Sequence, residues 1–108
     1  IFLINCEILN IAKSYGINDT DVIDVFNKSN ARSYISESRF PNNILNGKFN
    51  GKSSIKNLKK DLGMMNLILK KSNSKKKYTE LSNEILSKID DNLDIQDFTN
   101  IYKMWNKI

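Results

Sequence analysis

Apolar residues recur at intervals of three and four along almost the whole chain, and very few residues interrupt this pattern. Only four glycines and one proline are spread over the 108 residues. The alternation of apolar and polar residues that is typical of half-buried strands occurs in few segments. An interval of three and four places apolar side chains on one face of an α-helix. The sequence therefore predicts an all-α fold of about six helices.

The first half of the chain is predicted to hold three helices. The first ends at Gly16, a residue that readily adopts the left-handed conformation found after a helix. The second is capped by Asn18 and runs to about Lys28. A third, shorter helix is expected to begin at Asn30 and to end at Pro41, because proline interrupts helical hydrogen bonds. The apolar stripe of the first helix consists of Ile1, Ile4, Ile8, Ile11 and Tyr15.

A loop with two Asn-Gly pairs separates these helices from a second group of three. The clearest helix of the chain begins at Ser53 or Ser54 and ends near Lys71. Gly63 lies inside it and costs about 1 kcal/mol relative to Ala, so we expect close packing or function to explain this residue. The stripe of this helix consists of Ile55, Leu58, Leu62, Met65 and Leu69. The fifth helix carries Tyr78, Leu81, Ile85 and Ile89. A sixth is expected to begin at Asp94.

The chain has no histidine and a single cysteine, Cys6, which excludes several classes of catalytic site. Without an imidazole there is no histidine base or metal ligand, and one cysteine forms neither an intramolecular disulfide nor a zinc site. We therefore expect no metal, and we interpret Cys6, which lies among apolar neighbours, as a core residue. The longest apolar run, Ile1–Ile4, is far shorter than the roughly 20 residues that span a membrane. The sequence indicates a cytoplasmic chain without a membrane partner.

Lysine and arginine outnumber aspartate and glutamate by 17 to 12, and the excess is concentrated in one segment. Residues 52–77 hold nine lysines and one acid, Asp61, whereas residues 80–97 hold six acids and one lysine. A nucleic-acid surface would combine such lysines with aromatic side chains, and only Tyr78 lies near. We interpret the segment as a solvated lysine face and expect no nucleic-acid partner. A small basic binding or oligomerisation module without catalytic activity stays open as an alternative function.

Several short segments occur in an order and spacing that resemble a known family. They are Glu7-Ile8-Leu9, Gly16-Ile17-Asn18, Ser29-Asn30-Ala31-Arg32-Ser33-Tyr34 and Lys60-Asp61-Leu62-Gly63. This order resembles the C-terminal helical domain of the β-hydroxyacid dehydrogenases, the 3-hydroxyisobutyrate dehydrogenase-like enzymes, over nearly the whole chain. The resemblance implies a helical bundle like the C-terminal domain of 6-phosphogluconate dehydrogenase. Residues 1–108 would then be one helical domain, the C-terminal part of a longer two-domain enzyme.

The resemblance also implies an activity and its partners. Enzymes of this family transfer a hydride between NAD or NADP and a small 3-hydroxy acid or semialdehyde. The cofactor would be bound mainly by an N-terminal Rossmann domain, whose Gly-x-Gly-x-x-Gly segment is missing from these residues. The catalytic lysine would lie about three turns before Glu7, so the chain alone is expected to be inactive. The implied partners are that Rossmann domain and further copies of the chain, in a homodimer or homotetramer whose subunit interface this domain provides.

Two residues match the family's cofactor motif, and a third departs from its substrate pocket. Lys60 and Asp61 match a Lys-Asp pair that faces the cleft between domains, where a lysine brings a positive charge near an anionic dinucleotide. The alternative interpretation of Lys60 is a solvated face, because it follows Lys59 in a lysine-rich chain. The resemblance would place Ser53 in the substrate cleft, at a position where the family commonly has Phe. Either an altered substrate or a lost activity is the expected consequence.

Overall fold

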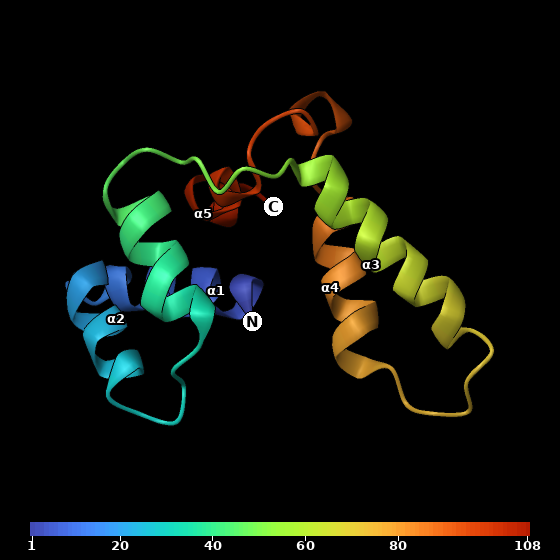
Figure 1. Cartoon of the computed structure of the whole chain (residues 1–108), viewed down its shortest axis with the longest axis horizontal. Helices are drawn as coiled ribbons and strands as arrows, with labels where there is room; N and C mark the ends of the chain where they lie inside the picture. Colours follow the sequence, from blue (N-terminus) through green and yellow to red (C-terminus); the bar gives the residue numbers. More distant parts are fainter. The chain divides into compact units, whose positions relative to one another are not determined.

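The computed structural model describes residues 1–108 and confirms an all-α fold of about six helices (Figure 1). The chain divides into two compact units. The first unit comprises residues 1–51 and 99–107, and the second comprises residues 52–98 with Ile108. None of the helices combines the length and the apolar character needed to cross a lipid bilayer.

The first helix, α1 (Phe2–Ser14), has the predicted extent but buries a different face from the one that its isoleucines mark. Gly16 follows it with a φ of +77°, as the sequence predicts. The buried residues of α1 are Phe2, Asn5, Cys6 and Leu9. The predicted stripe points away from them, and its members, Ile1, Ile4, Ile8, Ile11 and Tyr15, are 38–81% exposed. The helix is therefore apolar on two faces, and the core of the first unit covers only one of them.

The second helix, α2 (Asp19–Asn27), begins at the predicted cap. The side-chain oxygen of Asn18 accepts a hydrogen bond of 3.0 Å from the backbone N–H of Asp21, one of the helix's otherwise unpaired donors. Val22 and Ile23 are buried. The helix therefore packs against the first unit through its apolar face.

The third helix differs from the prediction at both ends. It is a π-helix, η1 (Ile35–Leu45), so the expected start at Asn30 and the expected end at Pro41 are both wrong. Two serines bond each other at its start: the N–H of Ser36 donates to Ser33 Oγ at 3.2 Å, and the N–H of Ser33 donates to Ser36 Oγ at 2.9 Å. These reciprocal bonds satisfy the first turn three residues after the position that the sequence suggested.

Pro41 is tolerated inside η1 because another residue supplies the hydrogen bond that it lacks. In a π-helix the N–H of each residue bonds the carbonyl five residues earlier, which for Pro41 is the carbonyl of Ser36. This carbonyl instead accepts a hydrogen bond of 3.2 Å from the side-chain amide of Asn27, at the end of α2. A tertiary contact thus lets the helix continue past a residue that ordinarily ends one.

The chain's last segment returns to the first unit as short helices, α5 (Ile101–Met104) and the 3₁₀ turn Trp105–Lys107. An aromatic cluster holds it there: the ring of Phe40 lies 5.8 Å from Tyr102 and 6.0 Å from Phe2. The hydroxyl of Tyr102 donates a hydrogen bond to a carboxylate oxygen of Asp19. Burial, and then this hydrogen bond, raise the pKa of Tyr102.

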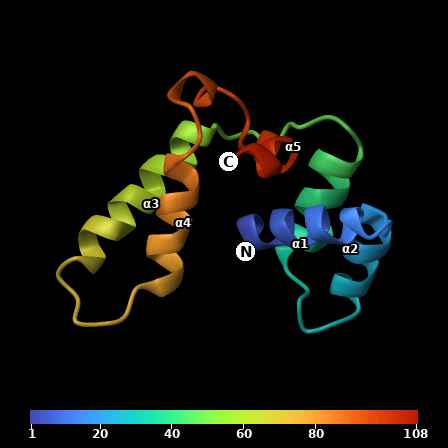
Figure 2. The ribbon, with the colours of Figure 1, turned by 180° about the vertical axis from the view of Figure 1, so that it is seen from behind.

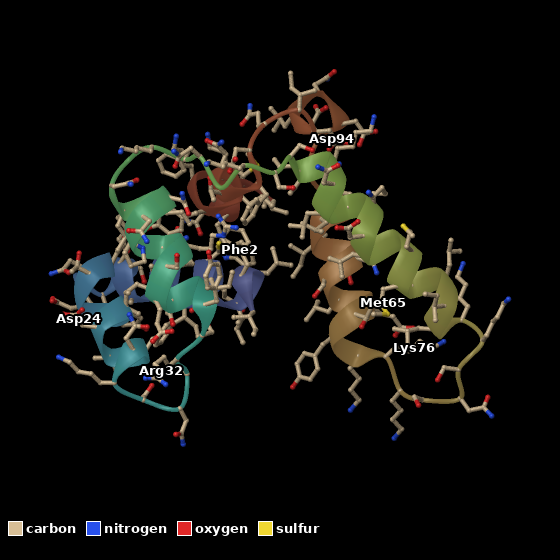
Figure 3. All side chains as sticks on the ribbon, viewed as in Figure 1. Phe2, Asp24, Arg32, Met65, Lys76 and Asp94 are labelled. Atoms are coloured by element: carbon tan, nitrogen blue, oxygen red, sulfur yellow. The ribbon has the colours of Figure 1, made fainter.

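The second unit is a helical hairpin in which α3 (Ile55–Leu69) and α4 (Lys77–Ser87) lie side by side, as the front and back views agree (Figure 2). Ser54 caps α3, as predicted, by accepting a hydrogen bond of 3.2 Å from the N–H of Asn57. The loop that joins the helices includes Lys76 (Figure 3). Both helices are confirmed, but their predicted stripes are only partly buried. Met65, Tyr78 and Leu81 are 49%, 85% and 52% exposed, and Ile89 lies beyond the end of α4.

The sixth helix does not begin at Asp94, because the backbone carbonyls of this segment accept hydrogen bonds from α3 instead of from a following helical turn. The carbonyls of Asp94 and Gln96 accept hydrogen bonds of 3.0 and 2.9 Å from the N–H groups of Lys56 and Ile55. These are first-turn donors of α3 that have no partner within the helix. Residues 94–97 therefore pass across the start of α3, and Ile95, expected on an apolar face, is 87% exposed.

Lys59 joins the same segment to α3 through its side chain. Its ammonium donates a hydrogen bond of 2.9 Å to the carbonyl of Ile89 and lies 3.0 Å from Asp91 Oδ1 and 2.7 Å from Asp94 Oδ1. The side chains of Lys59 and Asp94 are each only 19% exposed, whereas that of Asp91 is 95% exposed. The pair with Asp94 is therefore shielded from solvent, and we expect it to contribute more than an ordinary surface ion pair.

We predict that Lys59→Ala lowers the free energy of unfolding by about 2 kcal/mol, because it leaves a carbonyl and a shielded carboxylate without their partner. Lys60→Ala is the matched control: the same change one residue later, on an exposed side chain, should cost less than about 0.5 kcal/mol. Urea unfolding followed by circular dichroism measures both. Equal losses for the two variants would contradict the role of Lys59.

We also predict that Asn27→Ala lowers the free energy of unfolding by about 1 kcal/mol by leaving the Ser36 carbonyl unpaired. Asn30→Ala, an exposed amide on the following turn, should have no measurable effect. In a Pro41→Ala background the alanine N–H can bond the Ser36 carbonyl in place of the Asn27 amide. Asn27→Ala should then lower the free energy of unfolding by less than it does in the wild type. A double-mutant cycle by urea unfolding tests this coupling, and strict additivity would contradict it.

Candidate functional site

The structure places Lys60 and Asp61 in the second turn of α3, on an open surface of the second unit. Their side chains are 62% and 70% exposed, and Lys60 Nζ lies 3.4 Å from Asp61 Oδ1. An ion pair this exposed contributes little to stability, so it holds the two side chains only loosely. Both are free to approach a ligand, although no contact in the structure assigns one, and their cofactor role stays a prediction.

The side chain of the neighbouring Lys59, in contrast, is held by contacts within the protein. Burial lowers the pKa of Lys59, but the hydrogen bonds to Asp94 and Asp91 outweigh this effect, and the pKa lies above its ordinary value of 10.5. The ammonium is charged at neutral pH and already has three oxygen partners. Of the two adjacent lysines, only Lys60, which the motif singles out, has a largely exposed side chain.

The face of α3 that carries Lys60 is partly apolar. Lys60, Met64 and Leu67 follow one another at helical spacing, and Met64, Leu67 and Ile68 are 57–67% exposed. Gly63 borders this face, and a Cβ added there would have no atom within 4 Å. Packing inside the chain therefore does not explain this glycine. The functional explanation of Gly63 stays a prediction.

Ser53 lies just before α3, close in sequence to its cap. The Ser53 carbonyl accepts a hydrogen bond of 2.9 Å from the N–H of Phe98, and its hydroxyl accepts a long one of 3.4 Å from the side chain of Asn57. Lys52, the residue before it, has a φ of +63° and donates its N–H to Asp97 at 2.8 Å. The backbone around Ser53 is therefore fixed, and its side chain is exposed. Its place in a substrate cleft remains untested.

Two surface hollows lie away from these three residues. One, of about 460 Å³, is lined by Asn27, Lys28, Ser29, Asn30 and Arg32 in the first unit. The other, of about 310 Å³, is lined by Lys59, Asn83, Leu86, Ser87 and Asp91 in the second unit. The second hollow borders a lysine whose hydrogen bonds are already made. Neither encloses Ser53, Lys60 or Asp61, which the structure brings together only as neighbours along the start of α3.

The contacts of Lys59 could not be predicted from the sequence. The acids that hold Lys59 come about thirty residues later, and the sequence shows only that residues 80–97 are acidic. Cys6, interpreted as a core residue, is fully buried, and this burial raises the pKa of its thiol. No three His, Cys, Asp or Glu side chains are grouped so that they could hold a metal ion.

One comparison with known proteins is informative. A family model described as NAD-binding of NADP-dependent 3-hydroxyisobutyrate dehydrogenase matches residues 1–105, a range that contains Ser53, Lys60 and Asp61. A search among curated proteins found no match to the chain.

We predict that the stability contributed by Lys59 is constant from neutral pH to about 10.5 and decreases as the pH rises further. Its pKa is higher in the folded than in the unfolded chain, so the contribution is complete below the unfolded value and is lost as pH rises through the folded value. The difference in unfolding free energy between wild type and Lys59→Ala, measured over this range, reports it. A difference that persists in strongly alkaline solution would count against the ion pair.

Proposed function

Because the chain belongs to the family of NAD-binding domains of NADP-dependent 3-hydroxyisobutyrate dehydrogenases, we propose that it forms one wall of the cofactor and substrate cleft of an NAD(P)-dependent oxidoreductase. The substrate we propose is a small 3-hydroxy acid or a short semialdehyde. The observation that carries the proposal is the family match over residues 1–105, which includes the Lys60–Asp61 pair.

Among the residues of this chain, the Lys60–Asp61 pair fits the charge of the cofactor. NAD and NADP are anionic, and the nicotinamide supplies the hydride transfer when the cofactor is bound. Lys60 offers an exposed ammonium on a flexible stem, with only a loose contact to Asp61 to compete for it. We propose that Lys60 attracts the dinucleotide and that Asp61 orients polar groups beside it. Lys59 keeps α3 in place for this contact through its bonds to Ile89 and Asp94.

Ser53 is proposed to border the substrate. Its exposed hydroxyl makes only one long hydrogen bond, so it is available to a hydroxyl or carboxylate of a small acid. A serine excludes water from a pocket less well than an aromatic ring does. We propose that the substrate of this protein is more polar than one that packs against Phe.

The remaining parts of the enzyme are proposed to lie outside these 108 residues. A Rossmann domain of the same protein would hold most of the cofactor. The catalytic lysine would also lie outside these residues. Further copies of the chain, in a homodimer or homotetramer, would complete the assembly through the helical domain. The chain by itself is then expected to show no turnover.

We predict that NADPH added to the isotopically labelled chain shifts amide NMR signals around Lys60 and Asp61, with a dissociation constant of about 1 mM. Lys60→Ala should remove these shifts, because it removes the attracting charge. Lys71→Ala, an exposed lysine beyond the other end of α3, should leave them unchanged.

Two outcomes would contradict the proposal. Shifts centred on residues 70–77 that duplex DNA reproduces and salt abolishes would favour the basic binding module. Reduction of NADP by 3-hydroxyisobutyrate with these 108 residues alone would contradict the placement of the catalytic lysine outside them.

A further inference from the structure

The backbone immediately before Ser53 has an unfavourable conformation. Lys52 has a φ of +63°, in the left-handed region that residues with a Cβ atom seldom adopt outside Asn and Asp. Its side chain is exposed, so burial of this side chain does not explain the conformation. Residues in such conformations persist only where the surrounding structure holds them, and they are concentrated at ligand-binding and active sites. The conformation of Lys52 therefore needs both a structural cause and a purpose.

The structural cause is a hydrogen bond from a distant carboxylate. Asp97 Oδ2 accepts a bond of 2.8 Å from the backbone N–H of Lys52, and bonds to an ionised acceptor are stronger than those between neutral groups. The backbones also meet here, because Ser54 and Asp97 form an antiparallel bridge and the N–H of Phe98 donates to the Ser53 carbonyl at 2.9 Å. Among these contacts, the bond to Lys52 is the one that uses a side chain.

The conformation of Lys52 determines the direction of the side chain that follows it. The Ser53 hydroxyl makes one long hydrogen bond, of 3.4 Å, to the side chain of Asn57. A bond of this length fixes a side chain weakly, so the direction of the hydroxyl depends mainly on the backbone. If Lys52 returned to an extended conformation, the Cβ of Ser53 would turn to another side.

The start of α3 does not depend on this side chain. The first N–H groups of the helix donate to the backbone carbonyls of Asp94 and Gln96, which remain whatever residue stands at position 97. Loss of the Asp97 carboxylate should therefore change the direction of Ser53 and leave α3, with Lys60, in place.

We propose that Asp97 is a positioning residue for the substrate. By holding Lys52 in the left-handed conformation, it sets the direction in which Ser53 presents its hydroxyl to the small hydroxy acid. This inference deepens the proposed function and rests on the role given there to Ser53. Asp97 itself does not touch the substrate.

The first test compares two variants of Lys52 that differ only in backbone preference. Lys52→Gly and Lys52→Val both remove the ammonium, but glycine adopts a positive φ freely and the β-branched valine does not. The isotopically labelled chain is titrated with 3-hydroxyisobutyrate, and the amide NMR signal of Ser53 is followed. Lys52→Val should raise the dissociation constant at least about tenfold, whereas Lys52→Gly should change it less than about twofold. Equal changes in the two variants would overturn the inference.

The second test removes the carboxylate. Asp97→Ala should raise the same dissociation constant at least about tenfold, and Asp97→Asn, which keeps an oxygen acceptor, should restore it to within about threefold. Adding Lys52→Gly to Asp97→Ala should also restore binding, because glycine needs no partner to hold it. Gln96→Ala is the matched control: it shortens an exposed side chain, keeps the carbonyl that bonds α3 and should have no effect.

The outcomes separate this inference from the proposed function. The amide signals of α3 should keep their positions in Asp97→Ala, and displacement throughout the helix would show a merely structural role and overturn the inference. A wild-type dissociation constant in Asp97→Ala would overturn the inference alone. No shift at Ser53 in the wild type would overturn the substrate proposal and this inference together. Where Asp97→Ala fails to fold, the two Lys52 variants decide.

Discussion

The start of α3 depends on a segment that lies forty residues further along the chain. The first N–H groups of any helix lack partners within it, and here those of Ile55 and Lys56 donate to the carbonyls of Gln96 and Asp94. One turn later, the ammonium of Lys59 holds the same segment through the Ile89 carbonyl and Asp94. Through these contacts, one side of α3 packs against the rest of the second unit. The other side, Lys60 included, faces solvent as a consequence.

The sequence predicted those helices whose apolar stripe and end signals agree. α1, α2 and α3 were found because Gly16, Asn18 and Ser54 stand where a stop or a cap is needed, and each acts in that way. The prediction failed where a distant residue changes the meaning of a local signal. Pro41 did not end η1, because Asn27 bonds the carbonyl that proline leaves free. Asp94 did not begin a helix, because α3 uses its carbonyl. Pairings of this kind depend on the fold and leave no local pattern.

The candidate site shows the same limit for side chains. The order of short segments singled out Lys60 and Asp61, and the family match includes them, but composition alone could not separate Lys60 from Lys59. Adjacent residues of a helix point about 100° apart, which is enough to turn one lysine toward buried acids and the other toward solvent. The two lysines therefore differ in their surroundings: Lys59 is held by contacts within the protein, and Lys60 is exposed to solvent. The difference lies in the acids about thirty residues away that only Lys59 can reach.

The exposed apolar faces of α3 and α1 differ in the charges that they carry. The face of α3 mixes the apolar side chains of Met64 and Leu67 with the exposed ammonium of Lys60. The exposed row on α1, which consists of Ile1, Ile4, Ile8, Ile11 and Tyr15, contains no charged residue. Within α1, the core takes the face that carries Phe2, because this ring packs against Phe40 in the aromatic cluster. The isoleucines are left on the outside as a consequence of that packing, and a row of exposed apolar side chains is typical of a surface that another molecule covers.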